Sequence, residues 1–196
     1  MSATAAGRPI ATTRSAAGMP TGRLAVWWVI ASEIVIFGGL LGSYIMFRLS
    51  HDAFAQQAAH TNTLVGTINT FVLLTSSLAA VLGHKYAEEG NGPKAARQLY
   101  LTALGGLIFA GIKFLYEWPT EIHHGFTISS SPFWAFYYTA CGIHAAHVIA
   151  GVTIMLFIAP AARKGQELQR VELIGIYWHF VDVVWIFLFP LLYIAK

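Results

Sequence analysis

The stretch Ile176–Tyr193 reads IYWHFVDVVWIFLFPLLY. A helix that crosses a membrane needs about 20 mostly apolar residues, because each residue advances 1.5 Å through roughly 30 Å of hydrocarbon. His179 and Asp182 interrupt this apolar run three positions apart, so they share one face of the predicted helix. A charged side chain at that depth costs roughly 2.5–3.5 kcal/mol and normally faces protein or water. We therefore expect a transmembrane helix that is anchored to its neighbours through these two residues.

The composition of the whole chain indicates a membrane protein. The 196 residues are 56% hydrophobic and 11% charged, whereas about a quarter of the residues in soluble domains are charged. Residues 1–22 are polar and basic, lack the apolar core of a cleavable secretory signal, and are expected to form a flexible tail. We expect residues 23–196 to form one transmembrane domain. The single cysteine, Cys141, cannot form an intrachain disulfide and cannot build a cysteine-based metal site from this chain alone.

Four more apolar stretches have the length of a membrane-spanning helix, and short connections with turn residues separate them. The five predicted helices lie at about 24–48, 64–86, 97–118, 132–159 and 172–194. The turn residues fall at 50–52, 89–93, 118–119 with 124–125, and 160–165. The predicted fold is therefore an all-α bundle of five transmembrane helices.

The distribution of positive charge predicts the orientation of this bundle, because cytoplasmic connections are enriched in Lys and Arg. The N-terminal tail and the second and fourth connections together carry nine of the twelve Lys and Arg residues. The remaining three are Arg48, Lys113 and Lys196. We expect a cytoplasmic N-terminus and a periplasmic C-terminus. The formal net charge of +3 then follows from the topology and indicates no nucleic-acid partner.

Three further titratable side chains are predicted within the membrane. Glu33 lies near the middle of the first helix, where an isolated carboxylate is costly, so its side chain should be protonated or hydrogen-bonded. Two interpretations stay open for it, a proton-handling acid and an acid bonded to a neighbouring helix. His144 and His147 lie one helical turn apart and could contribute to a zinc, copper or haem site, but such a site needs further ligands. We expect hydrogen-bonded structural histidines and no metal site.

Four motifs point to a known family. They are YWHFVDVVW (177–185); Ser32-Glu33 followed by Phe37; NTFVLL followed by Ser76-Ser77 (69–77); and Glu117 with FTIS (126–129) and GIHAAHVIAG (142–151). Taken from the N-terminus to the C-terminus, they resemble in the same order the motifs of subunit III of the haem–copper respiratory oxidases, the cytochrome c oxidase subunit III family. The resemblance covers about residues 24–194. Full-length members have seven helices, and this chain begins where the third would be, so it resembles the short, five-helix form.

The resemblance implies an accessory integral-membrane subunit of a haem–copper terminal oxidase. Such a subunit packs on the catalytic subunit I, supports proton uptake into it and slows its inactivation during turnover. It has no catalytic residue and no redox centre, because the haem and copper of the complex belong to other subunits. The resemblance further implies subunit II, small subunits and phospholipids as partners, and a multi-pass location in a bacterial inner membrane.

The same resemblance assigns roles to individual residues. Glu33 matches the family carboxylate that reacts with hydrophobic carbodiimide reagents, which fits a protonated acid. The other membrane-embedded polar residues match positions that we interpret as interhelical contacts, namely His144, His147, His179 and Asp182. Three residues are candidates for contact with lipid or with a neighbouring subunit, namely Glu117, Trp178 and Trp185. Position alone favours a solvated or capping role for Glu117, since it ends the third predicted helix.

Two alternative functions stay open at this point. One is the homologous subunit of a quinol oxidase or of a nitric oxide reductase. The other belongs to a different class, a self-contained intramembrane metalloprotein or proton carrier built on Glu33, His144, His147 and His179. Stoichiometric metal or haem on the isolated chain would favour this second alternative.

Overall fold

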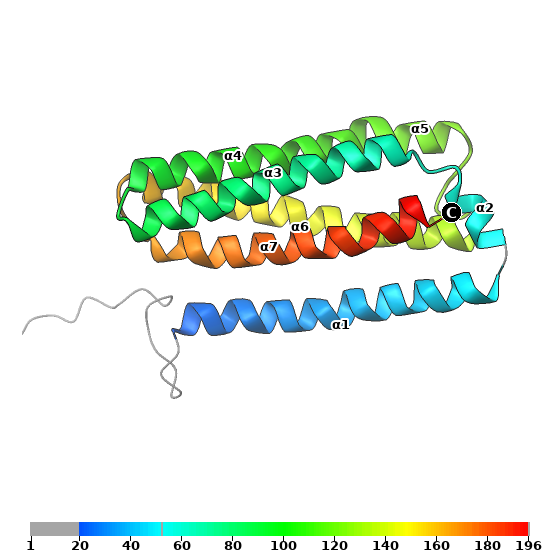
Figure 1. Cartoon of the computed structure of the whole chain (residues 1–196), viewed down its shortest axis with the longest axis horizontal. Coiled ribbons are helices and arrows are strands. Elements are labelled where there is room, and N and C mark those ends of the chain that lie inside the picture. The colour runs from blue at the N-terminus through cyan, green and yellow to red at the C-terminus, as the bar shows by residue number, and fades with distance from the viewer. Residues whose placement is uncertain (1–19, 52, 196) are drawn as a thin grey trace, which may run out of the picture.

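The computed structural model describes residues 20–51 and 53–195, and these ranges are helical almost throughout (Figure 1). Five helical spans within them are long and apolar enough to cross a membrane, which confirms the predicted five-helix bundle. The chain is therefore a multi-pass membrane protein. Most of the predicted tail, residues 1–19, lies outside the described ranges. The elements are α1 (Thr21–Ser50), α2 (Ala53–Ala58), α3 (Thr63–Glu88), α4 (Gly92–Gly111), the π-helix η2 (Ile112–Glu117), α5 (Trp118–His123), α6 (Pro132–Arg163), α7 (Gln169–Phe189) and the π-helix η3 (Pro190–Ile194).

The spans alternate in direction along one axis (Figure 1). We call the end at which α1 begins the basic end, since the α3–α4 and α6–α7 connections with their Lys and Arg residues also lie there. The other end, which holds α2, α5 and η3, is called the C-terminal end. Helices α3, α4, α6 and α7 pack closely on one another, whereas α1 lies at the edge of the bundle against α7 and α6. The described part of the chain is thus a four-helix core with one peripheral helix.

Side-chain caps fix the starts of three of these helices. The Oδ1 atoms of Asn62 and Asn91 accept hydrogen bonds from backbone N–H groups in the first turns of α3 and α4, each at 3.2 Å. Ser131 caps α6 in the same way and precedes Pro132, which fits the first helical turn because its nitrogen needs no partner there. The α6–α7 connection turns at Gly165, whose φ of 74° suits a residue without a side chain. Local sequence therefore sets these helix boundaries.

Two prolines that were expected to mark turns lie inside helical spans, which corrects part of the turn prediction. The third span continues through Pro119 to His123, and the chain turns only at Gly125, where φ is 87°. Likewise α6 continues through Pro160 to Arg163. A proline inside a helix lacks its N–H and crowds the carbonyl group four residues earlier. The π-helical segments η2 and η3 lie immediately before Pro119 and at Pro190, where their wider turns accommodate the rings.

The indole of Trp178 occupies a slot that two glycines leave open in the four-helix core. A Cβ atom placed on Gly106 would lie 2.6 Å from this ring, and one placed on Gly151 would lie 3.0 Å from it. The indole Nε1 donates a hydrogen bond to Ser76 Oγ at 3.1 Å. These small residues therefore permit close helix packing. The glycines of α1 do not, since a Cβ on Gly38, Gly39 or Gly42 would meet nothing within 4 Å.

Candidate functional site

Glu33 of α1 and His147 of α6 form a pair that links the peripheral helix to the core. Glu33 Oε2 lies 3.1 Å from His147 Nε2, and the two side chains are 14% and 21% exposed. The other ring nitrogen, Nδ1, lies 2.8 Å from the Ile143 carbonyl oxygen and must carry a hydrogen, because a carbonyl can only accept. The contact has ion-pair distance but not hydrogen-bond geometry. With one proton between the two facing atoms the pair has no net charge, either as a carboxylic acid beside a neutral imidazole or as a carboxylate beside an imidazolium.

Backbone carbonyl groups at the end of the last helix hold α1 at the C-terminal end of the bundle. The Tyr44 hydroxyl donates to the Leu191 carbonyl oxygen at 2.8 Å, and Arg48 Nη1 donates to that of Ala195 at 2.5 Å. Both acceptors lie in the last turn of the chain, where backbone carbonyls have no partner further along the helix. Polar contacts near the middle and at the C-terminal end therefore position α1.

His144 differs from His147 in both position and partners. Its side chain is fully buried, stacks on Trp185 with 5.1 Å between ring centroids, and meets the edge of Phe109. Neither ring nitrogen has a hydrogen-bond partner in the described part of the chain. The two histidines therefore have different neighbours: His147 contacts Glu33, and His144 contacts Trp185. Within residues 20–51 and 53–195, no three His, Cys, Asp or Glu side chains are grouped in a way that could hold a metal ion.

A buried ion pair at the C-terminal end is the feature that the sequence patterns missed. Lys113 and Glu117, both in η2, are 0% and 2% exposed, and Lys113 Nζ lies 2.9 Å from Glu117 Oε1. The Tyr137 hydroxyl of α6 donates to the same oxygen at 2.6 Å, and Tyr193 of η3 donates to it as well. Lys113 also donates to both tyrosine hydroxyls and lies over the Trp185 ring, 5.2 Å from its centroid. Both π-helical segments thus contribute to one closed cluster.

This cluster corrects two expectations. Lys113 was counted among the charges that flank the membrane, and Glu117 was expected to be solvated or in contact with lipid or another subunit. Each instead finds its partner inside the bundle, where an isolated charge would be costly. The i, i+4 spacing of Lys113 and Glu117 could have suggested a pair. Nothing in the sequence pattern indicates the tyrosine partners, which come from distant segments.

His179 and Asp182 are not bonded to each other, although they share one face of α7. His179 Nδ1 lies 2.7 Å from the Ser77 hydroxyl of α3. Asp182 is 4% exposed, and neither of its carboxyl oxygens has a hydrogen-bond partner among the described residues. The contact that ties α7 to α3 here is therefore the one between His179 and Ser77.

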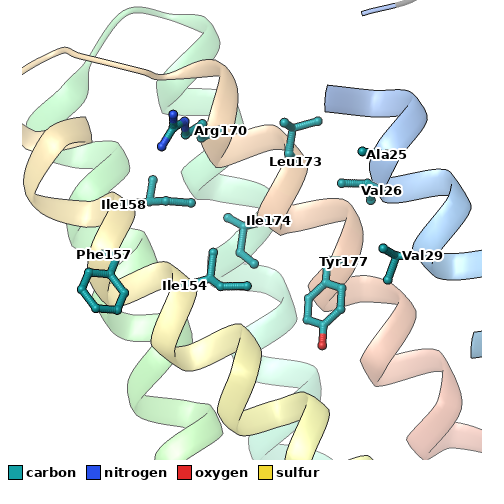
Figure 2. A pocket seen from close by; sticks show the side chains of 10 residues that line it. All are labelled: Ala25, Val26, Val29, Ile154, Phe157, Ile158, Arg170, Leu173, Ile174 and Tyr177. Atoms are coloured by element: carbon teal, nitrogen blue, oxygen red, sulfur yellow. The ribbon is translucent and has the colours of Figure 1, made fainter. Parts of the chain in front are cut away.

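A groove lies between α1, α6 and α7 in the basic half of the bundle (Figure 2). Its volume is about 480 Å³, and its walls are almost entirely aliphatic or aromatic. Arg170 lies toward the α6–α7 connection and Tyr177 at the opposite end of the groove (Figure 2). Arg170 also forms an ion pair with Glu167 at 3.0 Å. The groove has the apolar character of a site for a hydrocarbon chain.

Comparison with known proteins identifies the family. The family model described as cytochrome c oxidase subunit III matches residues 12–196. Cytochrome c oxidase subunit 3 of Thermostichus vulcanus is 32% identical over 170 residues, which cover 84% of this chain and 83% of the relative. The chain belongs to the cytochrome c oxidase subunit III family. It is an accessory-type chain of haem–copper oxidases, in agreement with the resemblance of its motifs.

Two further relatives differ in their context. The haem–copper oxidase subunit I+III of Aeropyrum pernix is 32% identical over 191 residues, which cover 88% of this chain but 22% of the relative. A probable quinol oxidase subunit 3 of Staphylococcus saprophyticus is 27% identical over 176 residues, which cover 87% of each chain. The subunit III family thus includes both fused and separate chains.

The two tryptophans of the subunit III motif YWHFVDVVW are buried within this chain. Trp178 and Trp185 are 0% and 1% exposed. Trp185 Nε1 donates to Thr70 Oγ1 of α3 at 3.0 Å, and Trp178 fills the glycine slot described above. The expected contact of these side chains with lipid or a neighbouring subunit is therefore wrong, because α3, α4 and α6 already surround them. In this family member the motif packs the core.

Proposed function

We propose that this chain packs directly on the catalytic subunit I of a haem–copper terminal oxidase and stabilises it, without a redox centre of its own. The observation that carries the proposal is the Aeropyrum pernix relative, whose name joins subunits I and III and whose matched segment is 22% of its length. Two subunits that occur in one chain work in the same complex. The corresponding partner of this separate chain is subunit I, with subunit II and small subunits in the same assembly.

A role in proton uptake is supported by the Glu33–His147 pair. With one proton between them the two largely buried side chains are neutral, so the pair can exist within the membrane without an unpaired charge. Carboxyl and imidazole groups are both side chains that can accept and release a proton. We infer that the pair both ties α1 to the core and supports proton uptake into subunit I.

The proposed orientation places the basic end on the cytoplasmic side of a bacterial inner membrane. Lys113 no longer counts as a flanking charge, because it is buried in its ion pair. Nine Lys and Arg residues then stand against two, Arg48 and Lys196. The buried position of Lys113 therefore strengthens the support for a cytoplasmic N-terminus.

The groove between α1, α6 and α7 is proposed to hold an acyl chain of a membrane phospholipid. Its apolar walls and its open side in a membrane-spanning region favour this occupant. Such a lipid would fill the space between the peripheral helix and the core at the basic end. The two additional helices of seven-helix family members would not be needed to form this lipid site.

The electron donor of the complex separates two versions of the proposal. The relative from Staphylococcus saprophyticus is named as a quinol oxidase subunit, and a nitric oxide reductase is a further candidate. A copper-bearing subunit II in the purified complex would indicate cytochrome c as the donor. A complex without that subunit would favour the quinol version.

Metal and haem analysis tests the accessory role against the alternative of a self-contained metalloprotein. We expect haem and copper in the intact oxidase, and neither of them, nor zinc, in stoichiometric amount on this chain after it is separated in detergent. Among the described residues, the fully buried His144 and the paired His147 do not converge on a common ligand set. Stoichiometric copper, zinc or haem on the separated chain would refute the accessory role.

The substitution Glu33→Gln is expected to leave the oxidase assembled and initially active. The glutamine amide can still donate a hydrogen bond to His147 Nε2, so the contact between α1 and α6 persists while the titratable carboxyl is lost. Haem content and initial oxygen consumption of the purified complex are the measurements. Loss of the haem from the complex would contradict the expectation that Glu33 is not required for assembly of the haem-bearing subunit.

A further inference from the structure

A second groove lies between α4 and α6 at the basic end of the bundle, where α4 begins and α6 ends (Figure 1). Its volume is about 450 Å³. Arg97 and Tyr100 of α4 and Arg163 of α6 line it, together with Leu101 and Leu104. This groove therefore combines two cations with an apolar wall, whereas the groove between α1, α6 and α7 has a single arginine that already has an ion-pair partner.

The two arginines of this groove have no counter-ion within the described part of the chain. Neither α4 nor α6 contains an Asp or Glu residue along its length. Among the residues that the structure describes, Arg97 and Arg163 form no ion pair, whereas Arg23 and Arg170 each pair with a glutamate. Both groove arginines are exposed. Two guanidinium groups that line one groove repel each other, and an anion placed between them removes this repulsion.

The charged and the apolar parts of the groove lie at different depths. The span that contains α4, Gly92–His123, has 32 residues and is thus roughly 48 Å long. The hydrocarbon core is roughly 30 Å thick, so about 9 Å at each end of a centred span lies in the headgroup layer. Arg97 is about 7.5 Å from the start of α4 and Leu104 about 18 Å from it. Arg163 is the last residue of α6. The arginines are therefore level with the lipid phosphates, and Leu104 is level with the acyl chains.

We propose that this groove binds an anionic phospholipid, with its phosphate between the two arginines and an acyl chain along Leu101 and Leu104. Guanidinium groups bind phosphate through paired, charge-assisted hydrogen bonds, which are stronger than those between neutral groups. The ring of Tyr100 fits the same boundary, because tyrosine is enriched where the hydrocarbon meets the headgroups. Basic pockets between transmembrane helices on the cytoplasmic side are typical sites for such lipids.

The apolar wall identifies a lipid as the source of the phosphate. A free phosphate ion would contact the arginines and leave Leu101 and Leu104 uncovered, whereas a phospholipid covers both parts of the groove. A zwitterionic lipid such as phosphatidylcholine also brings a positive choline group near the two guanidinium groups, so a lipid with a net negative charge is favoured. This part of the α4–α6 face is therefore turned to lipid and not to a neighbouring subunit.

The inference goes beyond the proposed function and does not use the acyl-chain site between α1, α6 and α7. It draws on the proposed orientation only to place the lipid in the cytoplasmic leaflet. Binding of this lipid can therefore fail while the association with subunit I stands.

Native mass spectrometry of the purified oxidase complex tests the site. The complex is stripped of lipid in detergent and titrated with phosphatidylglycerol, or with phosphatidylcholine of the same acyl chains. The affinity for one phosphatidylglycerol molecule is expected to fall about fivefold in Arg97→Gln and in Arg163→Gln, and about 25-fold in the double variant. Arg97→Lys retains the charge but not the paired hydrogen bonds, so its affinity should lie between those of wild type and Arg97→Gln. Because both arginines are exposed, these substitutions leave the packing of the core intact.

The matched control is Lys85→Gln, which removes an exposed cation at the same end of the bundle, in the last turn of α3 and outside the groove. Its affinity for phosphatidylglycerol should equal that of the wild type. Wild-type affinity that is equal for phosphatidylcholine and phosphatidylglycerol would overturn the site, and so would a carboxylate of a neighbouring subunit paired with Arg97 or Arg163 in the complex. If the double variant binds phosphatidylglycerol like the wild type while the chain still purifies with subunit I, the lipid site is refuted and the proposed function is not.

Discussion

Replacing Glu117 with glutamine is expected to lower the free energy of unfolding of this chain by about 3–5 kcal/mol, the largest effect that we predict for one substitution. The change preserves shape but leaves the Lys113 ammonium buried without a counter-charge. Three donors converge on the Glu117 Oε1 atom, from Lys113, Tyr137 and Tyr193. A neutral amide oxygen satisfies them less well than a carboxylate does. Thermal and denaturant unfolding in detergent measure the loss.

Two further variants separate the burial of a charge from a general effect of substitution. Adding Lys113→Met to Glu117→Gln removes both charges, so most of the lost stability should return. Glu167→Gln breaks the exposed pair with Arg170 and should cost about 1 kcal/mol or less. If Glu117→Gln proved no more destabilising than Glu167→Gln, the cluster would not contribute to the stability of the bundle in the way described.

The substitution Gly106→Ala is expected to destabilise the four-helix core by about 1–3 kcal/mol, the cost of overpacking. Its new methyl group would lie 2.6 Å from both the Trp178 ring and a Val152 methyl group. Trp178 cannot easily move away, because its Nε1 is bonded to Ser76 and Gly151 confines its other side. Retention of the subunit in the detergent-extracted complex and its unfolding temperature are the measurements.

Gly38→Ala in α1 is the matched control, since the same methyl group there meets nothing within 4 Å. Alanine is the better helix former by roughly 0.5–1 kcal/mol, so this variant of the chain alone should be slightly more stable than the wild type. The two substitutions are thus predicted to act in opposite directions. A Gly106→Ala chain as stable as the Gly38→Ala chain would contradict the close packing around Trp178.

Helix number and class could be predicted from the sequence, because hydrocarbon thickness sets a minimum length that five apolar stretches meet. The π-helical segments could not be predicted in the same way. Pro119 reads as a turn signal, but the helical span continues through it to His123, directly after the wider turns of η2. Local sequence patterns therefore predict the presence and length of each helix, but not its π-helical segments.

Candidate polar residues were found by their depth in apolar stretches, but their partners were not. Glu33 and His147 meet because α1 packs beside α6, a tertiary relation that no spacing along the chain encodes. Lys113 and Glu117 were assigned to a surface because charges near a helix end usually lie there. Their burial depends on Tyr137 and Tyr193, which arrive from two other segments. Tertiary packing therefore decides which polar residues pair and which face water.

The most direct test of the central claim is purification of this chain, with an affinity tag, from its native membrane in a mild detergent. We predict that a haem–copper catalytic subunit accompanies it in stoichiometric amount, seen as reduced-haem absorbance, bound copper and a polypeptide identified as subunit I by mass spectrometry. Recovery of the folded chain without haem, copper and subunit I would contradict its assignment as an accessory subunit of such an oxidase.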